Sequence, residues 1–230
     1  MTITHHNVSR TAGALLLSAV ALMTASAAVA VPAGLALNPQ DPAATLRAVQ
    51  DRVGLHLLEL GLDVLGWLAL TGAALALAVC AVTAGRPAHA VPAGLLALCG
   101  TAGLLHDAGN LAVTRLAADP ADPVTAATAE AVLLTAKWGV NLAGLLWVSA
   151  TAAAVCLPGR PAGRRRAGAV AALSGLAAVV LPWTTGTDGP SPQLEQLGYA
   201  LHLPVMAWWG FLGWRCLRTG PTEAEPTPRG

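Results

Sequence analysis

The chain has 230 residues, of which 55% are hydrophobic and only 11% are charged, whereas a soluble domain is about 25% charged. Its formal net charge is +1, so nothing in the composition indicates a nucleic-acid partner. Intrinsic disorder requires low hydrophobicity and high net charge, and this composition excludes it. The chain is therefore predicted to be all-α: a polytopic helical bundle surrounded by a lipid bilayer.

Six stretches are apolar enough to span a membrane, which takes about 20 residues. They cover about residues 11–37, 54–85, 91–116, 124–157, 167–185 and 193–217. We expect them to form a single domain, 1–218, followed by a disordered cytoplasmic tail, 219–230. The first stretch also resembles a signal peptide, because Ala28-Val29-Ala30 fits a cleavage site. Cleavage would leave five spans, but the apolar run continues to Leu37 and favours an uncleaved span.

The distribution of arginines predicts the orientation, because short cytoplasmic loops carry an excess of Lys and Arg. With the N-terminus inside, nine arginines fall on the inner side and three on the outer side. We therefore expect both termini in the cytoplasm. The inner arginines are Arg10, Arg86, Arg160, Arg164, Arg165, Arg166, Arg215, Arg218 and Arg229, and the outer ones are Arg47, Arg52 and Arg115.

A short helix is predicted between the first two spans. Asp41 followed by Pro42 is a favourable N-cap and first helical position. Leu46, Val49 and Val53 then fall on one helical face. We expect a short interfacial amphipathic helix on the outer membrane surface.

Polar side chains form stripes on four of the six predicted spans. An ionisable residue inside a membrane is costly and indicates a functional site. Because each helical residue turns the chain by about 100°, each group falls on or beside one face of its helix. The groups are His56, Glu59 and Asp63; His106, Asp107 and Asn110; Glu130, Lys137 and Asn141; and Glu195, Tyr199 and His202.

These stripes all lie toward the outer ends of their spans. At about 1.5 Å per residue, Asp63, His106 and His202 lie roughly 15 Å below the outer helix ends. We therefore expect a polar cavity in the outer half, lined by the second, third, fourth and sixth spans, with the other two as scaffold. The expected ligand- or ion-binding residues are His56, Glu59, Asp63, His106, Asp107, Asn110, Glu130, Lys137, Asn141, Tyr199 and His202.

The charge of this cavity leaves several interpretations open. Lys137 is the only lysine in the chain, and by depth Asp63 or Asp107 is its best-placed partner. Such a pair could serve only to fix the helix register. Alternatively, acids near the membrane surface are hydrated, some acids are protonated, or the site holds a cation, because unpaired charges are not stable in hydrocarbon.

Three function classes fit these residues. The first is small-solute or proton- or cation-linked binding or transport, which for so small a chain favours a homodimer. The second is a non-catalytic subunit of a membrane complex. The third is a metalloenzyme or haem protein. Zinc would be held in a three-histidine or mixed site by His56, His106, His202 and one of Asp63 or Asp107, or haem b by His106 and His202. The sequence has no HExxH motif, and we expect neither a cofactor nor enzymatic activity.

Two segments resemble known sequences. Residues 41–67, which lead into the second span, and residues 138–146 are similar to uncharacterised multi-pass membrane proteins of high-GC bacteria. The preference for arginine over lysine and the many alanines agree with such a source. The resemblance covers about a third of the chain and contains no diagnostic motif. It implies a helical bundle in the bacterial plasma membrane and assigns neither an activity nor a site residue.

Overall fold

The computed structural model describes residues 2–159, 161–182, 184 and 191–218, so the tail expected at 219–230 lies outside the described part. Within these residues every secondary-structure element is helical, as predicted. The α-helices are α1 (Thr2–Ala30), α2 (Pro42–Asp51), α3 (Val53–Thr83), α4 (Ala90–Leu116), α5 (Pro123–Cys156), α6 (Ala162–Val180) and α7 (Pro192–Arg218), and a short 3₁₀ helix covers Pro87–His89.

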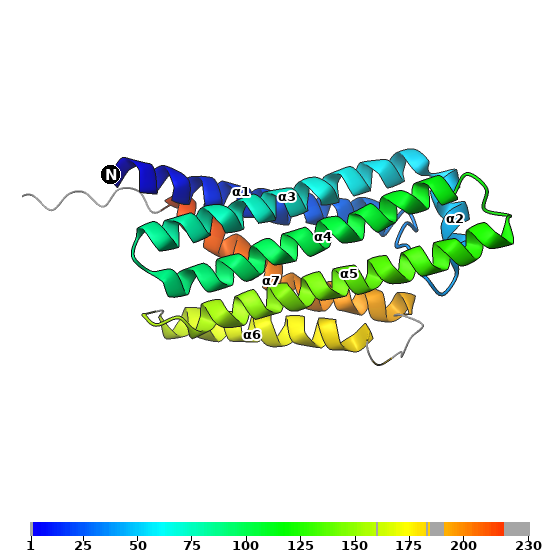
Figure 1. Ribbon diagram of the computed structural model, residues 1–230. Helices are drawn as coiled ribbons and strands as arrows, with labels where there is room; N and C mark the ends of the chain where they lie inside the picture. Colours follow the sequence, from blue (N-terminus) through cyan, green and yellow to red (C-terminus); the bar gives the residue numbers. More distant parts are fainter. Residues whose placement is uncertain (1, 160, 183, 185–190, 219–230) are drawn as a thin grey trace, which may run out of the picture.

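The six long helices run alternately up and down and close into a ring (Figure 1). Each packs on its neighbours in chain order, and α7 returns to pack on α1. Helix α2 lies at one end of the bundle, which we call the α2 end (Figure 1). The opposite end carries Arg86, Arg164 and Arg215, and we call it the basic end.

A dry core fills the half of the ring nearer the basic end. Leu70, Leu96 and Ala150 are fully buried there, together with Trp208 and Trp209. The indole N–H of Trp209 donates to the Thr151 hydroxyl at 2.9 Å, so this polar group is satisfied inside an otherwise apolar layer.

The bounds of α3, α4, α5 and α7 agree with the predicted spans to within two residues, whereas those of α1 and α6 differ at both ends. Helix α6 begins at Ala162, five residues before the predicted start at residue 167, and includes three consecutive arginines, 164–166. Helix α1 ends at Ala30, although the apolar run continues to Leu37. Gly34 adopts φ 64°, a conformation that favours glycine and ends helices. The apolar residues after it therefore belong to a connection and not to a longer span.

A second apolar cluster closes the α2 end. It contains Leu35 and Leu37 of the connection, Leu46 and Val49 of α2, and Leu133 of α5. The predicted cap of α2 is confirmed, because Asp41 accepts a hydrogen bond from the Ala44 amide at 2.9 Å. The apolar face of this helix packs on the bundle, and Val53, expected on the same face, lies outside the helix at the start of α3. Leu46 and Val49 are fully buried against the bundle because α2 covers the otherwise open end of the ring.

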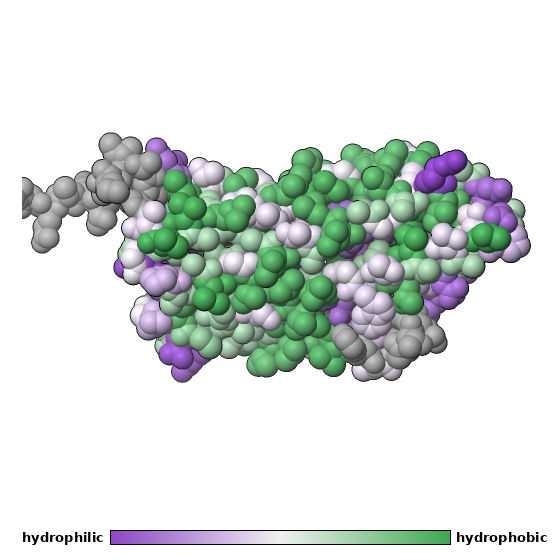
Figure 2. Space-filling view, in the orientation of Figure 1, coloured by the Kyte–Doolittle hydropathy of each residue, from purple (hydrophilic) through white to green (hydrophobic). Residues whose placement is uncertain are grey.

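The outer surface of the bundle is rich in apolar side chains. On the face that Figure 2 shows, apolar residues are spread along the middle of the molecule, while most strongly hydrophilic residues lie toward its two ends. Four helical segments are long and apolar enough to cross a membrane: Asn7–Ala30, Val53–Thr83, Pro87–Leu116 and Pro123–Cys156. Helices α6 and α7 do not meet that measure. Helix α6 begins with arginines, and α7 carries Glu195, His202 and other polar residues among its apolar ones.

Candidate functional site: a polar cavity at the α2 end

A cavity of about 300 Å³ lies between the ring helices in the half nearer the α2 end. Its lining includes residues from all six long helices, so the expectation that the first and fifth spans only support it is wrong. Eight of the eleven expected residues line it: Glu59, Asp63, His106, Asn110, Lys137, Asn141, Tyr199 and His202.

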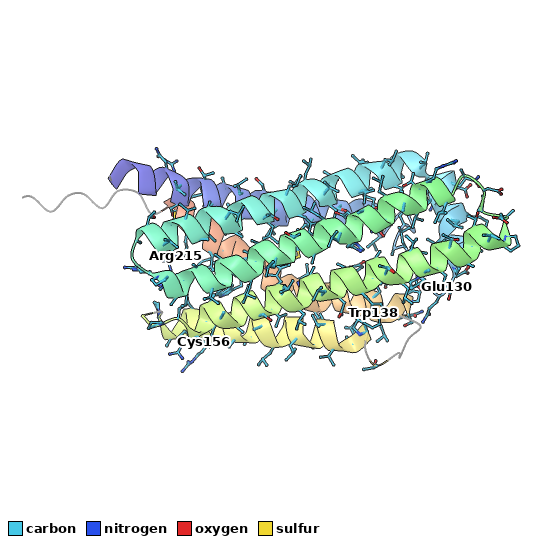
Figure 3. All side chains as sticks on the ribbon, viewed as in Figure 1. Glu130, Trp138, Cys156 and Arg215 are labelled. Atoms are coloured by element: carbon cyan, nitrogen blue, oxygen red, sulfur yellow. The ribbon has the colours of Figure 1, made fainter. Side chains whose placement is uncertain are left out.

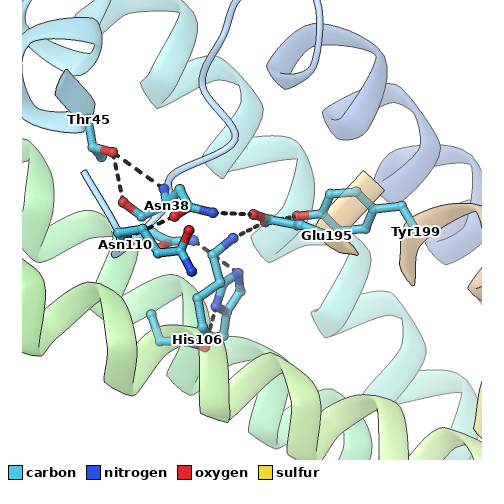
Figure 4. A network of polar contacts seen from close by, with 9 residues as sticks. Asn38, Thr45, His106, Asn110, Glu195 and Tyr199 are labelled. Carbon is cyan, nitrogen blue, oxygen red and sulfur yellow. Dashed lines mark hydrogen bonds and ion pairs between the residues drawn. The ribbon is translucent and has the colours of Figure 1, made fainter. Parts of the chain in front are cut away.

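A buried ion pair between Lys137 and Glu195 joins α5 to α7 beside this cavity. Both side chains are more than 90% buried. The Glu195 carboxylate also accepts a hydrogen bond from the Tyr199 hydroxyl at 2.8 Å and one from the Asn38 amide at 3.4 Å. Figure 4 shows this carboxylate as the meeting point of the network.

The predicted partner of Lys137 is therefore wrong, since neither Asp63 nor Asp107 pairs with it. Acids near the membrane surface could have been hydrated, and Glu195 falls in the first turn of its helix. In the structure Glu195 is only 8% exposed, and Asn38 of the connection before α2 donates to it. A lysine side chain is long enough to reach such a carboxylate.

Asn38 is a site residue that the sequence analysis missed. It lies in the connection between α1 and α2, and its carbonyl accepts a hydrogen bond from the Thr45 hydroxyl at 3.1 Å. Its side-chain oxygen accepts from the Gln40 amide at 2.9 Å. These two contacts orient the amide group that donates to Glu195 (Figure 4). A loop residue has no helical periodicity, so no pattern in the sequence marked it.

His106 is held in a defined orientation across the α4–α5 contact. Its Nδ1 lies 2.8 Å from the Ala136 carbonyl oxygen, which can only accept, so Nδ1 carries the proton. Its Nε2 lies 3.0 Å from the Asn110 side-chain nitrogen and accepts that N–H. The imidazole is therefore in the neutral Nδ1–H form in this arrangement (Figure 4).

His56 and Glu59 form a second buried pair on α3. His56 is fully buried, and its Nδ1 lies 3.0 Å from a Glu59 carboxylate oxygen. The Ser26 hydroxyl of α1 lies 2.9 Å from the Glu59 carbonyl and 3.3 Å from its carboxylate. Ser26 was also missed, because a lone serine on an apolar helix gives no stripe. His56 is occupied by this pair and does not line the cavity.

Asp63, His106 and Asp107 come together between α3 and α4. Each offers a ligand atom, and these atoms all lie within 4.8 Å of one another. The Trp67 indole donates to Asp63 at 3.1 Å. Asp107 is only 2% exposed, and within the described part of the chain neither of its carboxylate oxygens has a hydrogen-bond partner.

The structure does not add His56 or His202 to this group, so the three-histidine zinc hypothesis gains no support from the geometry. His202 instead packs edge-on against Trp147, with 5.3 Å between the ring centres. The geometry gives no specific support for haem b either, because His202 packs against Trp147 and is not among the potential ligands grouped with His106.

Two expected residues of α5, Glu130 and Asn141, differ in where they lie. Glu130 is exposed on α5 near the α2 end and does not line the cavity (Figure 3). Asn141 does line it, and its amide donates to the Val179 carbonyl of α6 at 2.9 Å.

Tryptophans separate the cavity from the dry core. Trp67 and Trp147 line the cavity and also belong to the apolar cluster below it. Their rings meet edge to face with centres 6.0 Å apart. The sequence analysis did not place them at the site, because an aromatic residue within an apolar span does not stand out from the core.

Comparison of the chain with protein-family models, curated proteins and solved structures finds no match. The functional interpretation therefore depends on the geometry of the cavity and on the charges that surround it.

Proposed function

We propose that this chain is a six-span integral membrane protein whose outward-facing cavity binds a small solute or cation, in a proton- or cation-linked binding or transport function. Helices long and apolar enough to cross a membrane support the membrane part of this proposal. The six-span count and the ligand class go further and rest on the following observations.

The positions of α6 and α7 support counting them as spans. Both are members of the closed ring, beside helices that meet the length and apolarity of a membrane span. Large apolar side chains are exposed along both of them, among them Val170 and Leu173 on α6 and Leu203 and Phe211 on α7. Such a surface is unfavourable in water and suited to lipid. Helix α6 has 19 residues, and at about 1.5 Å per residue its length is close to the hydrocarbon thickness.

The arginine bias orients this bundle. Arg86, Arg164 and Arg215 gather at the basic end, which is the cytoplasmic end under the positive-inside rule. The α2 end and its cavity then face the outside of the cell. We place the protein in the bacterial plasma membrane with both termini inside.

One observation carries the ligand proposal: the buried Lys137–Glu195 pair borders a cavity instead of being enclosed by packed side chains. A pair that only fixes helix register needs no space beside it. Polar groups around an apolar-walled cavity of about 300 Å³ are typical of small-ligand sites.

Cysteine accessibility tests the cavity. In a variant in which serine replaces the four native cysteines, Ala178→Cys places a thiol in the cavity lining and Ala150→Cys places one in the dry core. A membrane-impermeant thiol reagent added outside should label the first much faster than the second. Equal labelling of both, or no labelling of Ala178→Cys in folded protein, contradicts an outward-facing cavity.

Transport is tested in proteoliposomes that contain a pH-sensitive dye. An imposed pH gradient should dissipate faster with the wild-type protein than with the Glu195→Gln variant. Glu130→Gln is the matched control, because Glu130 is exposed and outside the cavity. Cavity labelling without any flux would contradict proton-linked transport and favour a binding or subunit role.

A further inference from the structure

Among the residues that the structure describes, no cation pairs with two carboxylates near the cavity, the buried Asp107 and the half-buried Asp63. Asp63 on α3 and Asp107 on α4 approach within 4.8 Å, counted between their potential ligand atoms. The nearby basic groups are engaged elsewhere, since Lys137 pairs with Glu195 and His56 with Glu59. Like charges at this separation repel strongly in a site of low dielectric. The arrangement therefore calls for either a shared proton or a bound cation between the two carboxylates.

Asp107 points to the same need on its own. It is only 2% exposed, and both of its carboxylate oxygens are unpartnered among the residues that the structure describes. A buried polar atom without a partner is costly and calls for an explanation, such as an ion at the site.

The third member of the group, His106, is oriented as a metal ligand would be. Its Nδ1–H donates to the Ala136 carbonyl, which leaves the lone pair of Nε2 available. Histidines that bind metals almost always donate the other ring N–H in this way, to a carbonyl or a carboxylate. The side-chain N–H of Asn110 now donates to Nε2. The side-chain oxygen of Asn110 is buried and unpartnered in the described structure. Rotation of this amide group could bring the oxygen, in place of the nitrogen, toward Nε2.

We propose that Asp63, His106 and Asp107 form a binding site for a divalent first-row transition-metal ion. One imidazole nitrogen with two carboxylate oxygens suits borderline ions such as Zn²⁺, Co²⁺ or Mn²⁺ better than the soft Cu⁺. Asp63 and His106 line the cavity, whereas Asp107 does not. The ion would therefore keep a coordination position open to the cavity. This inference rests on the proposed function and makes it specific by identifying the cation.

Metal binding is measured on the full-length protein in detergent after treatment with a chelator. Calorimetric titration with Zn²⁺ should show one saturable site per chain, and Co²⁺ should give visible absorption bands of a bound ion. Mg²⁺ in large excess should not displace Zn²⁺, because it prefers oxygen ligands and keeps its waters. The absence of saturable Zn²⁺ binding to folded wild-type protein overturns the proposal, and this includes the outcome in which the two carboxylates only share a proton.

The variants Asp63→Asn and Asp107→Asn identify the ligands. Each should weaken Zn²⁺ binding by more than about 10-fold. Loss of a residue that only contacts a ligand costs about 10-fold or more, and loss of a ligand itself should cost more than that. Glu130→Gln should leave it unchanged. Unaltered affinity in both asparagine variants would place any bound zinc elsewhere and contradict the site.

The thermal unfolding temperature distinguishes metal ligands from residues with only a structural role, because the two cases predict changes of opposite sign in the metal-free variants. Without metal, each asparagine variant should unfold at a higher temperature than the wild type, because it removes the repulsion. Zn²⁺ should stabilise only the wild type and the Glu130→Gln control. Lower metal-free stability of both variants, with an unchanged shift on adding Zn²⁺, contradicts the proposal.

The thiol-labelling test separates this inference from the proposed function. Labelling of Ala178→Cys without zinc binding refutes the metal site alone. Zinc binding without labelling refutes the outward-facing cavity instead.

Discussion

The two ends of the bundle are built from the same kinds of helices but hold different spaces. The cavity toward the α2 end has residues of the connection before α2 in its lining, together with acids and a lysine. The hollow at the basic end is larger, about 920 Å³, and its lining as the structure describes it contains arginines but no acid. Between them lies a dry layer of tryptophan, leucine and alanine.

The two ends differ in the free-energy cost of removing their charged groups from water. Charges in the hollow at the basic end belong to side chains that reach the surface, such as the exposed Arg86. The charges near the α2 end are buried, and burial of an ion pair opposes stability unless hydrogen bonds complete it. Glu195 has such bonds from Asn38 and Tyr199. The retention of a costly polar network beside a cavity is the physical reason for assigning function to this end.

The largest expected effect comes from breaking the ion pair. Lys137→Met should lower the free energy of unfolding by about 3–5 kcal/mol, because it leaves the Glu195 charge buried without a cation. The double variant Lys137→Met/Glu195→Gln should lose much less than the sum of the two single changes. Thermal unfolding in detergent measures all three.

A second double variant provides the control for this pairing. Lys137→Met combined with Asp107→Asn should be nearly additive, because the two side chains form no ion pair. Strong coupling in that variant, with additivity in Lys137→Met/Glu195→Gln, would restore the pairing inferred from depth alone.

A smaller loss should follow from opening the α2 end. Leu46 is fully buried in the cluster that closes this end, so Leu46→Ala should cost about 2–3 kcal/mol, toward the lower part of the range for such changes, because an end cluster can relax. The same change should speed thiol labelling of Ala178→Cys. Leu58→Ala is the control, since Leu58 is 52% exposed on α3. If the two variants behave alike, α2 does not close the cavity.

The layer between the two spaces should tolerate no added atoms. A Cβ on Gly103 would lie 2.1 Å from the ring of Trp67, so Gly103→Ala should destabilise by about 1–3 kcal/mol. Gly94 is on the same helix with nothing within 4 Å of its Cβ position. Gly94→Ala should therefore be neutral or stabilising by up to about 1 kcal/mol. The unfolding temperature should fall in Gly103→Ala and stay the same or rise in Gly94→Ala. A change of the same sign in both variants would mean that the Trp67 ring can move away from the added methyl group.

The helices could be predicted well from the sequence, and the site only in part. Long apolar runs set the helix lengths, and the i, i+3, i+4 and i+7 spacing brought His106, Asn110, Lys137 and Asn141 to one cavity. The end of α1 was missed, because residues up to Leu37 are apolar yet serve a loop that Gly34 allows. Apolarity marks burial, whether in lipid or in protein, and does not by itself specify a helix.

The contacts within the site could not be predicted, for a different reason. Periodicity gives the face of a residue on its own helix, but pairing depends on how neighbouring helices are offset and on what covers their ends. Glu195 pairs with Lys137 of α5 and also accepts from Asn38, which lies in the connection between α1 and α2. Such offsets are properties of the packed bundle, and a single sequence carries no direct sign of them.

The smallest expected effect concerns a polar residue at the α2 end that is outside the cavity. Asp122 caps α5, and its carboxylate accepts hydrogen bonds from the Thr125 hydroxyl at 2.9 Å and the Thr125 amide at 3.0 Å. These bonds, the hydroxyl first, hold the pKa of Asp122 below its usual value of 3.8. Because the pKa is lowered in the folded state, the cap stabilises above pH 3.8, and this stabilisation is lost as the pH falls through the lowered pKa.

Asp122→Ala should therefore lower the unfolding midpoint slightly at neutral pH, and the difference from the wild type should shrink below pH 3.8. Asp119→Ala is the matched control, because Asp119 lies in the same connection but is not the N-cap residue. Thermal unfolding at a series of pH values measures both variants. A difference that grows on acidification would show that Asp122 acts through its neutral form. The ionised carboxylate of Asp122 would then not be the form that stabilises the N-terminus of α5, and the contrast between this exposed cap and the buried Lys137–Glu195 network would fail.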